Sequence, residues 1–212
     1  MRMGDDTPVV SLMLPILVKP TLTKLEKDHD LAGTQVLRGA FSKAEAAHPG
    51  FTYDFVMGLA RRGDLACNIH ESLLKLQGRI SENEEVEFWL SRTEEPFQDL
   101  NRKASALKRI LGRIPEEITD RKSFLETIRE IASAIKKLLD TLSTVSAFLP
   151  SSSARAALDL RKKDFVKTSK RFSNTLKEYF KEGQSNNAVF VASMSLIYQT
   201  NLLILTIKRH GN

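Results

Sequence analysis

Residues 114–150 place the strongest constraint on the fold of this chain. Seven apolar side chains there recur at alternating steps of four and three residues: Phe124, Ile128, Ile131, Ile135, Leu138, Leu142 and Val145. This spacing keeps them on one stripe of an α-helix, with the heptad period of a helical bundle. We expect Pro115 with Glu116 and Glu117 in its first turn, where proline loses no required N–H. A helix of about 30 residues, or ~45 Å, requires partners of similar length.

The rest of the C-terminal half supplies such partners. Apolar residues follow helical spacing in 96–113, in 154–182 and in 188–208. Four helices with short turns predict an up-down four-helix bundle over residues 96–212. The last segment carries no charge from Gln184 to Ile207, a length that also spans a membrane. Its Ser, Thr, Asn and Gln side chains favour the alternative, a central and most buried bundle helix.

The N-terminal half has shorter helical segments. Residues 31–47 form one helix, with Val36, Leu37, Ala40, Phe41 and Ala44 on one face. Thr52 is expected to cap a second helix that ends at Gly63, and Asn68 to cap a third that ends at Gly78. Such short helices bury little surface alone, so we expect this region to oligomerise.

Two segments of different composition complete the organisation. Residues 8–27 are apolar and interrupted by Pro15 and Pro20, and residues 78–95 are rich in glutamate around Trp89, which we interpret as a packing anchor. The chain is therefore predicted to be all-α. We expect an N-terminal helical domain over 1–77, a partly helical linker over 78–95 and the bundle over 96–212.

Charge is distributed unevenly along the chain. Residues 1–90 carry 10 basic and 13 acidic side chains, whereas residues 91–212 carry 22 and 13. Such asymmetry is typical of a half that binds a partner. Cys67 is the only cysteine, which excludes an intrachain disulfide and indicates a reducing compartment. The first ten residues do not form a signal-peptide pattern.

No catalytic pattern is visible in the sequence. The four histidines are scattered, without a pair at metal-ligand spacing, and no glycine-rich loop follows a strand. Cys67 has only His70 nearby as a base, and we interpret it as a packed cysteine. We therefore expect no enzyme activity, no metal and no cofactor.

The most distinctive functional feature is a basic face in the C-terminal half. Five lysines share one face of the third bundle helix: Lys163, Lys167, Lys170, Lys177 and Lys181. A second basic line on the long helix has small residues at its centre: Arg129, Ala132, Ser133 and Lys136. Two such helices form a groove flanked by positive charge, which fits an amphipathic acidic helix.

Other interpretations of this basic face are a solvated surface and a site for anionic lipid, such as phosphoinositide headgroups, or for nucleic-acid phosphate. The scarcity of arginine and the absence of an exposed aromatic pattern argue against nucleic acid.

Several sequence runs resemble one known family. FQDLNRKASALKRILGRIPEEITDR, IASAIKKLLDT and KKDFVKTSKRFSNTLKEYFKEG, with TQVLRGAFSKAEAAHPG and ESLLKL nearer the N-terminus, are similar to the programmed cell death protein 10 family, also known as the third cerebral cavernous malformation protein family. The resemblance implies a non-catalytic adaptor. Its expected fold is an N-terminal helical dimerisation domain followed by a four-helix bundle similar to the focal adhesion targeting domain.

The resemblance also implies partners. The N-terminal domain is expected to homodimerise or to exchange that partner for germinal-centre group III sterile-20-like kinases. The bundle is expected to bind leucine-aspartate-type helices of paxillin and of the second cavernous malformation protein, and also striatin. The implied location is the cytoplasm, with pools at the Golgi and the plasma membrane.

Carried onto this chain, the resemblance assigns two sets of site residues. The dimer and kinase contacts are Leu37, Ala40, Leu59 and Ala60. The peptide-binding groove is Arg129, Ala132, Ser133, Lys136, Lys170, Ser173 and Lys177. Arg129 replaces a lysine of vertebrate family members, which keeps the charge. Ala60 replaces a leucine and Gly58 a lysine, and the smaller Ala60 is expected to weaken a buried dimer contact by roughly 2–3 kcal/mol.

Overall fold

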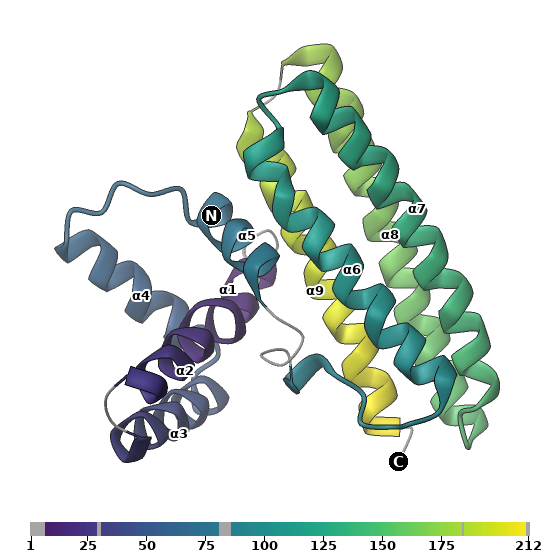
Figure 1. Ribbon diagram of the computed structural model, residues 1–212, viewed down its shortest axis with the longest axis horizontal. Coiled ribbons are helices and arrows are strands. Elements are labelled where there is room, and N and C mark those ends of the chain that lie inside the picture. Colours follow the sequence, from purple (N-terminus) through teal and green to yellow (C-terminus); the bar gives the residue numbers. More distant parts are fainter. Residues whose placement is uncertain (1–6, 29–30, 81–85, 184, 211–212) are drawn as a thin grey trace.

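The computed structural model describes residues 7–28, 31–80, 86–183 and 185–210, and these residues are almost entirely helical. Helices α6–α9 form a bundle, α1–α4 lie to one side of it, and α5 lies between the two groups (Figure 1). The elements, in chain order, are α1 (Thr7–Met13), the π-helix η1 (Leu14–Val18), α2 (Lys19–Asp28), α3 (Leu31–Ala47), α4 (Phe51–Arg62), α5 (Ile69–Arg79), the 3₁₀ turn η3 (Val86–Phe88), α6 (Glu95–Glu117), α7 (Arg121–Ala147), α8 (Ser152–Glu182) and α9 (Asn186–His210).

The four-helix bundle is confirmed. Its core contains the apolar stripes that the sequence predicted, including the fully buried Phe97, Leu107, Phe124 and Phe165. Helix α6 packs closely against α7, and α8 against α9, whereas α7 and α8 approach each other less closely. The bundle therefore consists of two tight helix pairs with a more open seam between α7 and α8.

The predicted start of the long helix is wrong. Pro115 lies in the last turn of α6, which Ile118 closes by donating its N–H to the Ile114 carbonyl over 2.9 Å. Helix α7 begins after Asp120, whose carboxylate accepts the N–H groups of Lys122 and Ser123 over 2.8 and 3.1 Å. An N-cap aspartate satisfies two orphan donors at once, which outweighs the proline signal.

Helix α5 packs directly onto the bundle, against α6 and α9. Its buried Leu73 and Leu74 join the bundle core. Gly78 lies within α5 and does not end it, because the helix continues to Arg79. Gly78 faces Gly112 of α6, and a Cβ built on Gly112 would lie 2.4 Å from the Gly78 Cα. The absence of both side chains is what allows the two helix backbones to approach this closely.

The segment before α6 is fixed by one side chain. Asn101 of α6 accepts the Leu90 N–H over 3.0 Å and donates its own amide to the Leu90 carbonyl over 2.9 Å. Leu90 is buried, whereas Trp89 is half-buried, so Leu90 and not the predicted Trp89 is the principal anchor. Lys208 near the end of α9 donates to the Glu87 carbonyl over 3.2 Å, which ties the same segment to the last helix.

The prolines near the N-terminus do not interrupt the helical chain as expected. In η1 the Lys19 N–H donates to the Leu14 carbonyl, five residues earlier. This wider turn relieves the clash between a proline ring and the carbonyl four residues before it. Residues 7–28 therefore run helically through Pro15 and Pro20, and Ile16 and Val18 become buried.

The start of α4 also differs from the prediction. Thr52 does not cap it, because Gly50, with φ of 95°, occupies the N-cap position. The cap comes instead from α3, where the Glu45 carboxylate accepts the N–H groups of Gly50 and Thr52, each over 2.8 Å. Gly63 ends the helix as predicted.

Two helical segments are long and apolar enough to cross a membrane by length and composition alone, Pro8–Glu26 and Asn186–His210. The second is 56% buried within the protein, where α9 contacts α5, α6 and α8. Core helices of globular proteins pass the same test, so this composition is explained by the position of α9 in the bundle.

Candidate protein-interaction surfaces

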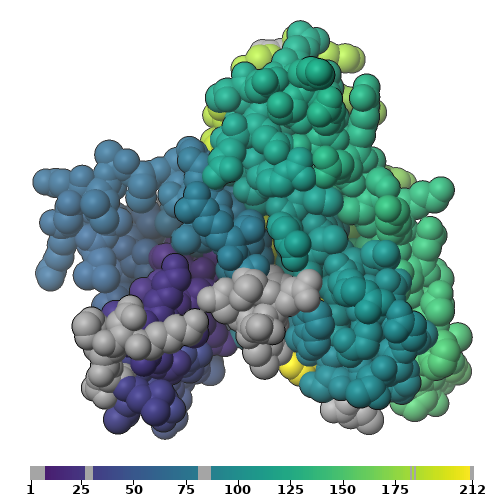
Figure 2. All heavy atoms as spheres, in the orientation of Figure 1, coloured from purple at the N-terminus to yellow at the C-terminus, as the bar shows by residue number. Residues whose placement is uncertain are grey.

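The first candidate site is an apolar surface on α3 and α4, which we call the α3–α4 surface: Leu37, Ala40, Leu59 and Ala60. Leu37 is 47% and Leu59 55% exposed, Ala40 is exposed and Ala60 is half-buried. These side chains do not belong to the core of the chain. In the space-filling view, α4 and the connection after it project from the body of the molecule (Figure 2).

Three aromatic rings join the two helices of this surface. Phe41 of α3 contacts Phe55 of α4 edge-on at 5.4 Å between centroids, and Phe51 lies 6.1 Å from each of them. Phe51 and Phe55 are nevertheless exposed. Exposed aromatic rings beside exposed leucines form the kind of patch that marks a protein–protein contact.

The second candidate site, which we call the α7–α8 face, contains the predicted groove residues. All seven are exposed: Arg129, Ala132, Ser133, Lys136, Lys170, Ser173 and Lys177. Helices α7 and α8 lie side by side on the side of the bundle away from α1–α4 (Figure 1).

Contacts at the two ends fix how the residues of this face are paired across the seam. The Phe124 and Tyr179 rings lie 5.8 Å apart, and the Lys162 ammonium donates to Ser143 over 2.7 Å. The helices are therefore antiparallel, and residues 129–136 lie opposite residues 168–175. Both basic lines thus flank the same stretch of the seam, with the serines and Ala132 between them.

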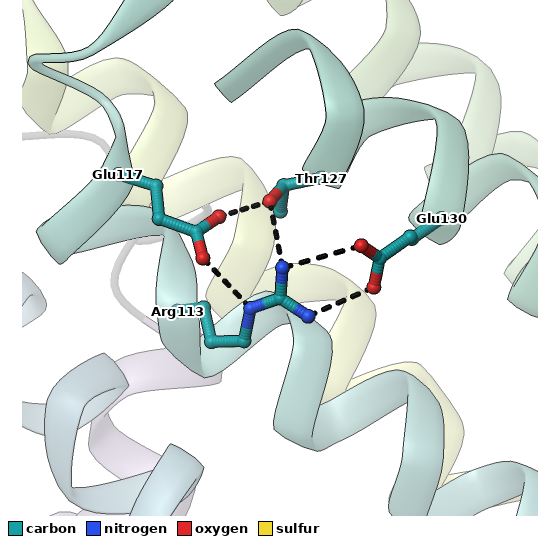
Figure 3. Close-up of polar contacts among 4 residues, drawn as sticks. All are labelled: Arg113, Glu117, Thr127 and Glu130. Atoms are coloured by element: carbon teal, nitrogen blue, oxygen red, sulfur yellow. Dashed lines mark hydrogen bonds and ion pairs between the residues drawn. The ribbon is translucent and has the colours of Figure 1, made fainter. Parts of the chain in front are cut away.

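Electrostatics leave this face positive. Among the described residues, no carboxylate forms an ion pair with Arg129, Lys136, Lys170 or Lys177. The neighbouring Glu130 is drawn toward α6, where Arg113 binds it (Figure 3). Its hydrogen bond to Arg113 holds the pKa of the Glu130 carboxyl below its usual range.

The Arg113 cluster connects α6 to α7 through four side chains. Arg113 donates to Glu130 over 2.8 and 3.3 Å, to Glu117 over 2.8 Å and to Thr127 over 3.2 Å, and Thr127 donates to Glu117 (Figure 3). Hydrogen bonds to Glu130 and Glu117 raise the pKa of Arg113 further above its ordinary value. The cluster holds α7 against α6 through two carboxylates. The opposite side of α7, which faces α8, carries the cations Arg129 and Lys136.

Sequence reasoning missed a pocket at the end of the α7–α8 seam. It has a volume of about 440 Å³ and lies where the α6–α7 and α8–α9 turns meet. Its lining includes Arg121, Phe124, Tyr179 and Phe180. The signal was available, because Phe180 follows Lys177 by three residues and continues the same stripe of α8.

The described residues contain no group of three or more His, Cys, Asp or Glu side chains placed to bind a metal. Cys67 is exposed in the connection between α4 and α5 and is not packed as expected.

Comparisons with known proteins agree with this arrangement. A family model described as programmed cell death protein 10, dimerisation domain, matches residues 6–66, and one described as programmed cell death protein 10, C-terminal, matches residues 67–159. The chain is also 38% identical over 197 residues to the Programmed cell death protein 10 homolog of Caenorhabditis elegans, with 90% of each chain covered. The chain belongs to the programmed cell death protein 10 family.

Membership places the α3–α4 surface within the dimerisation domain of the programmed cell death protein 10 family, so the apolar residues exposed on the single chain lie in the region that mediates self-association. The two matches meet between Ala66 and Cys67, in the connection that separates α4 from α5. The predicted boundary after residue 77 and the assigned contact residues stay predictions.

Proposed function

We propose that this protein is a non-catalytic adaptor with two separate docking surfaces. The α3–α4 surface binds either a second copy or the tail of a germinal-centre group III sterile-20-like kinase. The α7–α8 face binds acidic, leucine-aspartate-type helices, such as those of paxillin and the second cavernous malformation protein, and striatin. The adaptor thereby places the kinases in striatin-based complexes in the cytoplasm, at the Golgi and at the plasma membrane.

The observation that supports this proposal most directly is the exposure of apolar residues on α3 and α4 within the dimerisation domain. Leaving Leu37 and Leu59 in water is unfavourable by roughly 25 cal/mol per Å² of apolar surface, so association is driven by their burial. Because the surface comprises two helices joined by a short turn, a helical partner of similar length can replace the second copy.

The α7–α8 face uses a different balance of forces. Four cations that pair with no carboxylate of the described residues line a seam whose exposed centre includes the small side chains of Ala132, Ser133 and Ser173, so a helix can approach the backbone there. Leucines of that helix contact the half-buried Ile128, Ile135 and Leu139, while its carboxylates face the cations. Charge pairing guides the encounter, and apolar burial holds the complex.

Light scattering of the pure full-length chain, alone and with a kinase tail added, tests the first surface. A homodimer that converts to a one-to-one complex supports an exchangeable dimerisation module. A monomer that ignores the tail contradicts the kinase-adaptor proposal. Peptide titration tests the second surface: Lys136→Asp should abolish binding of an acidic helix and leave the dimer intact, and unchanged affinity would contradict the groove assignment.

The second candidate is peripheral membrane binding through phosphoinositide headgroups, favoured by the row of exposed lysines on α8, Lys163, Lys167, Lys170, Lys177 and Lys181. Flotation with vesicles that contain or lack phosphoinositides distinguishes it. Binding that depends on the lipid and falls steeply with salt supports this candidate, whereas binding to acidic helices that persists in salt supports the adaptor.

A further inference from the structure

The pocket where the α6–α7 and α8–α9 turns meet lies in direct continuation of the α7–α8 face. We propose that it is an anchor subsite, which takes a large apolar side chain and a neighbouring carboxylate from the terminal turn of the acidic helix bound there. This inference rests on the proposed function, and it adds a determinant of specificity at one end of the site.

Helical phase places the pocket on the same face as the cations. On α7, Leu125 and Arg121 precede Arg129 by four and eight residues, which keeps them on its stripe. On α8, Phe180 follows Lys177 by three residues. Leu125 and Phe180 are each 38% exposed, and the Phe124 and Phe180 rings lie 5.7 Å apart. The exposed apolar side chains of Leu125 and Phe180 therefore lie directly beyond the cations, at one end of the α7–α8 face.

The walls of the pocket suit an apolar or aromatic side chain. Phe124, Tyr179 and Phe180 form a cluster of rings with centroids 5.4 to 5.8 Å apart, and the buried Ile118 closes one side. Rings in such a cluster accept a further ring or branched side chain edge-on, and the volume of about 440 Å³ accommodates one.

The rim of the pocket supplies charge complementarity. Arg121 lines the pocket, is exposed, and forms no ion pair with any carboxylate of the described residues. The nearby Asp120 forms no ion pair with Arg121, and its carboxylate instead accepts the N–H groups of Lys122 and Ser123 at the start of α7. A pocket with aromatic rings on its walls and an exposed arginine at its edge recognises an apolar side chain that lies next to a carboxylate.

The geometry also sets the length of the partner helix. The segment 129–136 alone spans about 10 Å, which two helical turns of a partner cover. The span from Lys136 to Arg121 is about 22 Å, which requires roughly four turns. Length and a bulky residue in one terminal turn therefore select among acidic helices that the cations alone would bind equally.

Fluorescence anisotropy with the full-length chain tests this inference from the peptide side first. The probes are a labelled 15-residue acidic amphipathic peptide with a leucine in every turn, and two peptides in which the leucine of the first or of the last turn is alanine. We expect one of these two substitutions to weaken binding about tenfold, as for a lost apolar anchor. Equal affinities for all three peptides would overturn the proposal.

Two protein variants locate the lost contact. Phe180→Ala should weaken the parent peptide about tenfold and should bind the parent and the sensitive alanine peptide equally. Arg121→Glu should weaken the parent peptide further. The matched controls are Leu160→Ala, which removes an apolar side chain 60% exposed nearer the other end of α8, and Arg209→Glu at the end of α9. A loss with Leu160→Ala equal to that with Phe180→Ala would overturn the proposal.

The outcomes separate this inference from the proposed function. If Lys136→Asp abolishes binding while Phe180→Ala and the alanine peptides leave it unchanged, the α7–α8 face is retained and the anchor is rejected. If the unmodified chain binds no acidic peptide, the proposed function of the face fails, and the anchor fails with it.

Discussion

Arg113 on α6 binds Glu130 on α7 at two points, and in doing so turns the carboxylate that follows Arg129 away from the α7–α8 face. A contact between two bundle helices thus also sets the charge of a surface on the other side of α7.

Replacing Arg113 with alanine should therefore have two effects. The stability of the chain should fall by about 1 kcal/mol, since the pair is partly exposed and screened. Affinity for an acidic peptide should fall about twofold at low salt, because Glu130 loses its neutralising partner. Denaturant unfolding and peptide titration measure the two effects. Arg209→Ala is the matched control, and equal behaviour of both variants would contradict the coupling.

Leu37→Asp should convert the dimer into a folded monomer. A charge placed on an exposed α3 position costs the single chain little, but it is buried without a partner when two copies associate. Size-exclusion chromatography with light scattering gives the mass. Leu160→Asp, at a leucine on the bundle that is 60% exposed against 47% for Leu37, should remain dimeric. A dimeric Leu37→Asp would remove Leu37 from the interface.

Glu45 should make α4 sensitive to acid. Partial burial raises the pKa of its carboxyl, but hydrogen bonds from Thr52 and Gly50 outweigh this and leave the pKa below its usual range. A carboxyl with a lowered folded-state pKa contributes stability above its unfolded value, near 4.3, and loses it as the pH falls through the lowered value.

Glu45→Ala should therefore cost about 1 kcal/mol at pH 7, as for a lost helix cap. The cost should disappear in strongly acidic solution, where the parent carboxylate is itself protonated. Thermal unfolding at several pH values measures the difference, with Glu126→Ala on the exposed side of α7 as control. A pH-independent cost would mean that Glu45 acts through packing and not through its charge.

Gly112→Ala should destabilise the contact between α5 and the bundle. The added Cβ meets the Gly78 backbone at 2.4 Å and the Leu74 carbonyl at 3.0 Å, so the helices must separate. We expect a loss of about 1–3 kcal/mol by chemical denaturation, as for overpacking. Gly58→Ala is the contrasting control, since no atom lies within 4 Å of its added Cβ. It should raise stability by up to about 1 kcal/mol through helix propensity.

Asn101→Ala should release the segment before α6. It leaves the buried N–H and carbonyl of Leu90 without their partners, which costs about 2 kcal/mol. Hydrogen exchange should speed up at the Leu90 amide more than in the core of α6. Asn174→Ala, an exposed asparagine on α8, should change neither quantity, and an unchanged Leu90 amide in Asn101→Ala would show that other contacts hold the segment.

Much of the bundle follows from the sequence because apolar spacing reports directly on helix packing. The stripe from Phe124 to Val145 is an almost continuous line of buried or half-buried residues, and Asn68 caps α5 as its spacing with Glu71 indicated. The basic face was likewise predictable, since helical phase alone places Lys170, Ser173 and Lys177 together.

The errors arise where a distant residue decides a local feature. The sequence predicted Thr52 as the cap of α4, but Glu45 on α3 supplies it. Gly78 was predicted to end α5, whereas its actual role is to allow close contact with Gly112 of α6. The exposure of Leu37 could not be predicted from helical spacing, because an apolar helical face has the same spacing whether its own chain or a partner covers it.

The close contact between Gly78 and Gly112 has a consequence for assembly. It fastens α5 to the bundle, and α1 of the dimerisation domain also packs against α9, so the dimerisation domain is held close to its bundle by packing as well as by the connection over residues 63–68. A dimer therefore presents two α7–α8 faces at a limited separation. A ligand with two acidic helices, or ligands clustered together, gains avidity once the first helix is bound, by up to about 10²–10⁴-fold without any new contact. Retention on clustered ligands would thus report on dimerisation even where the affinity for a single peptide does not change.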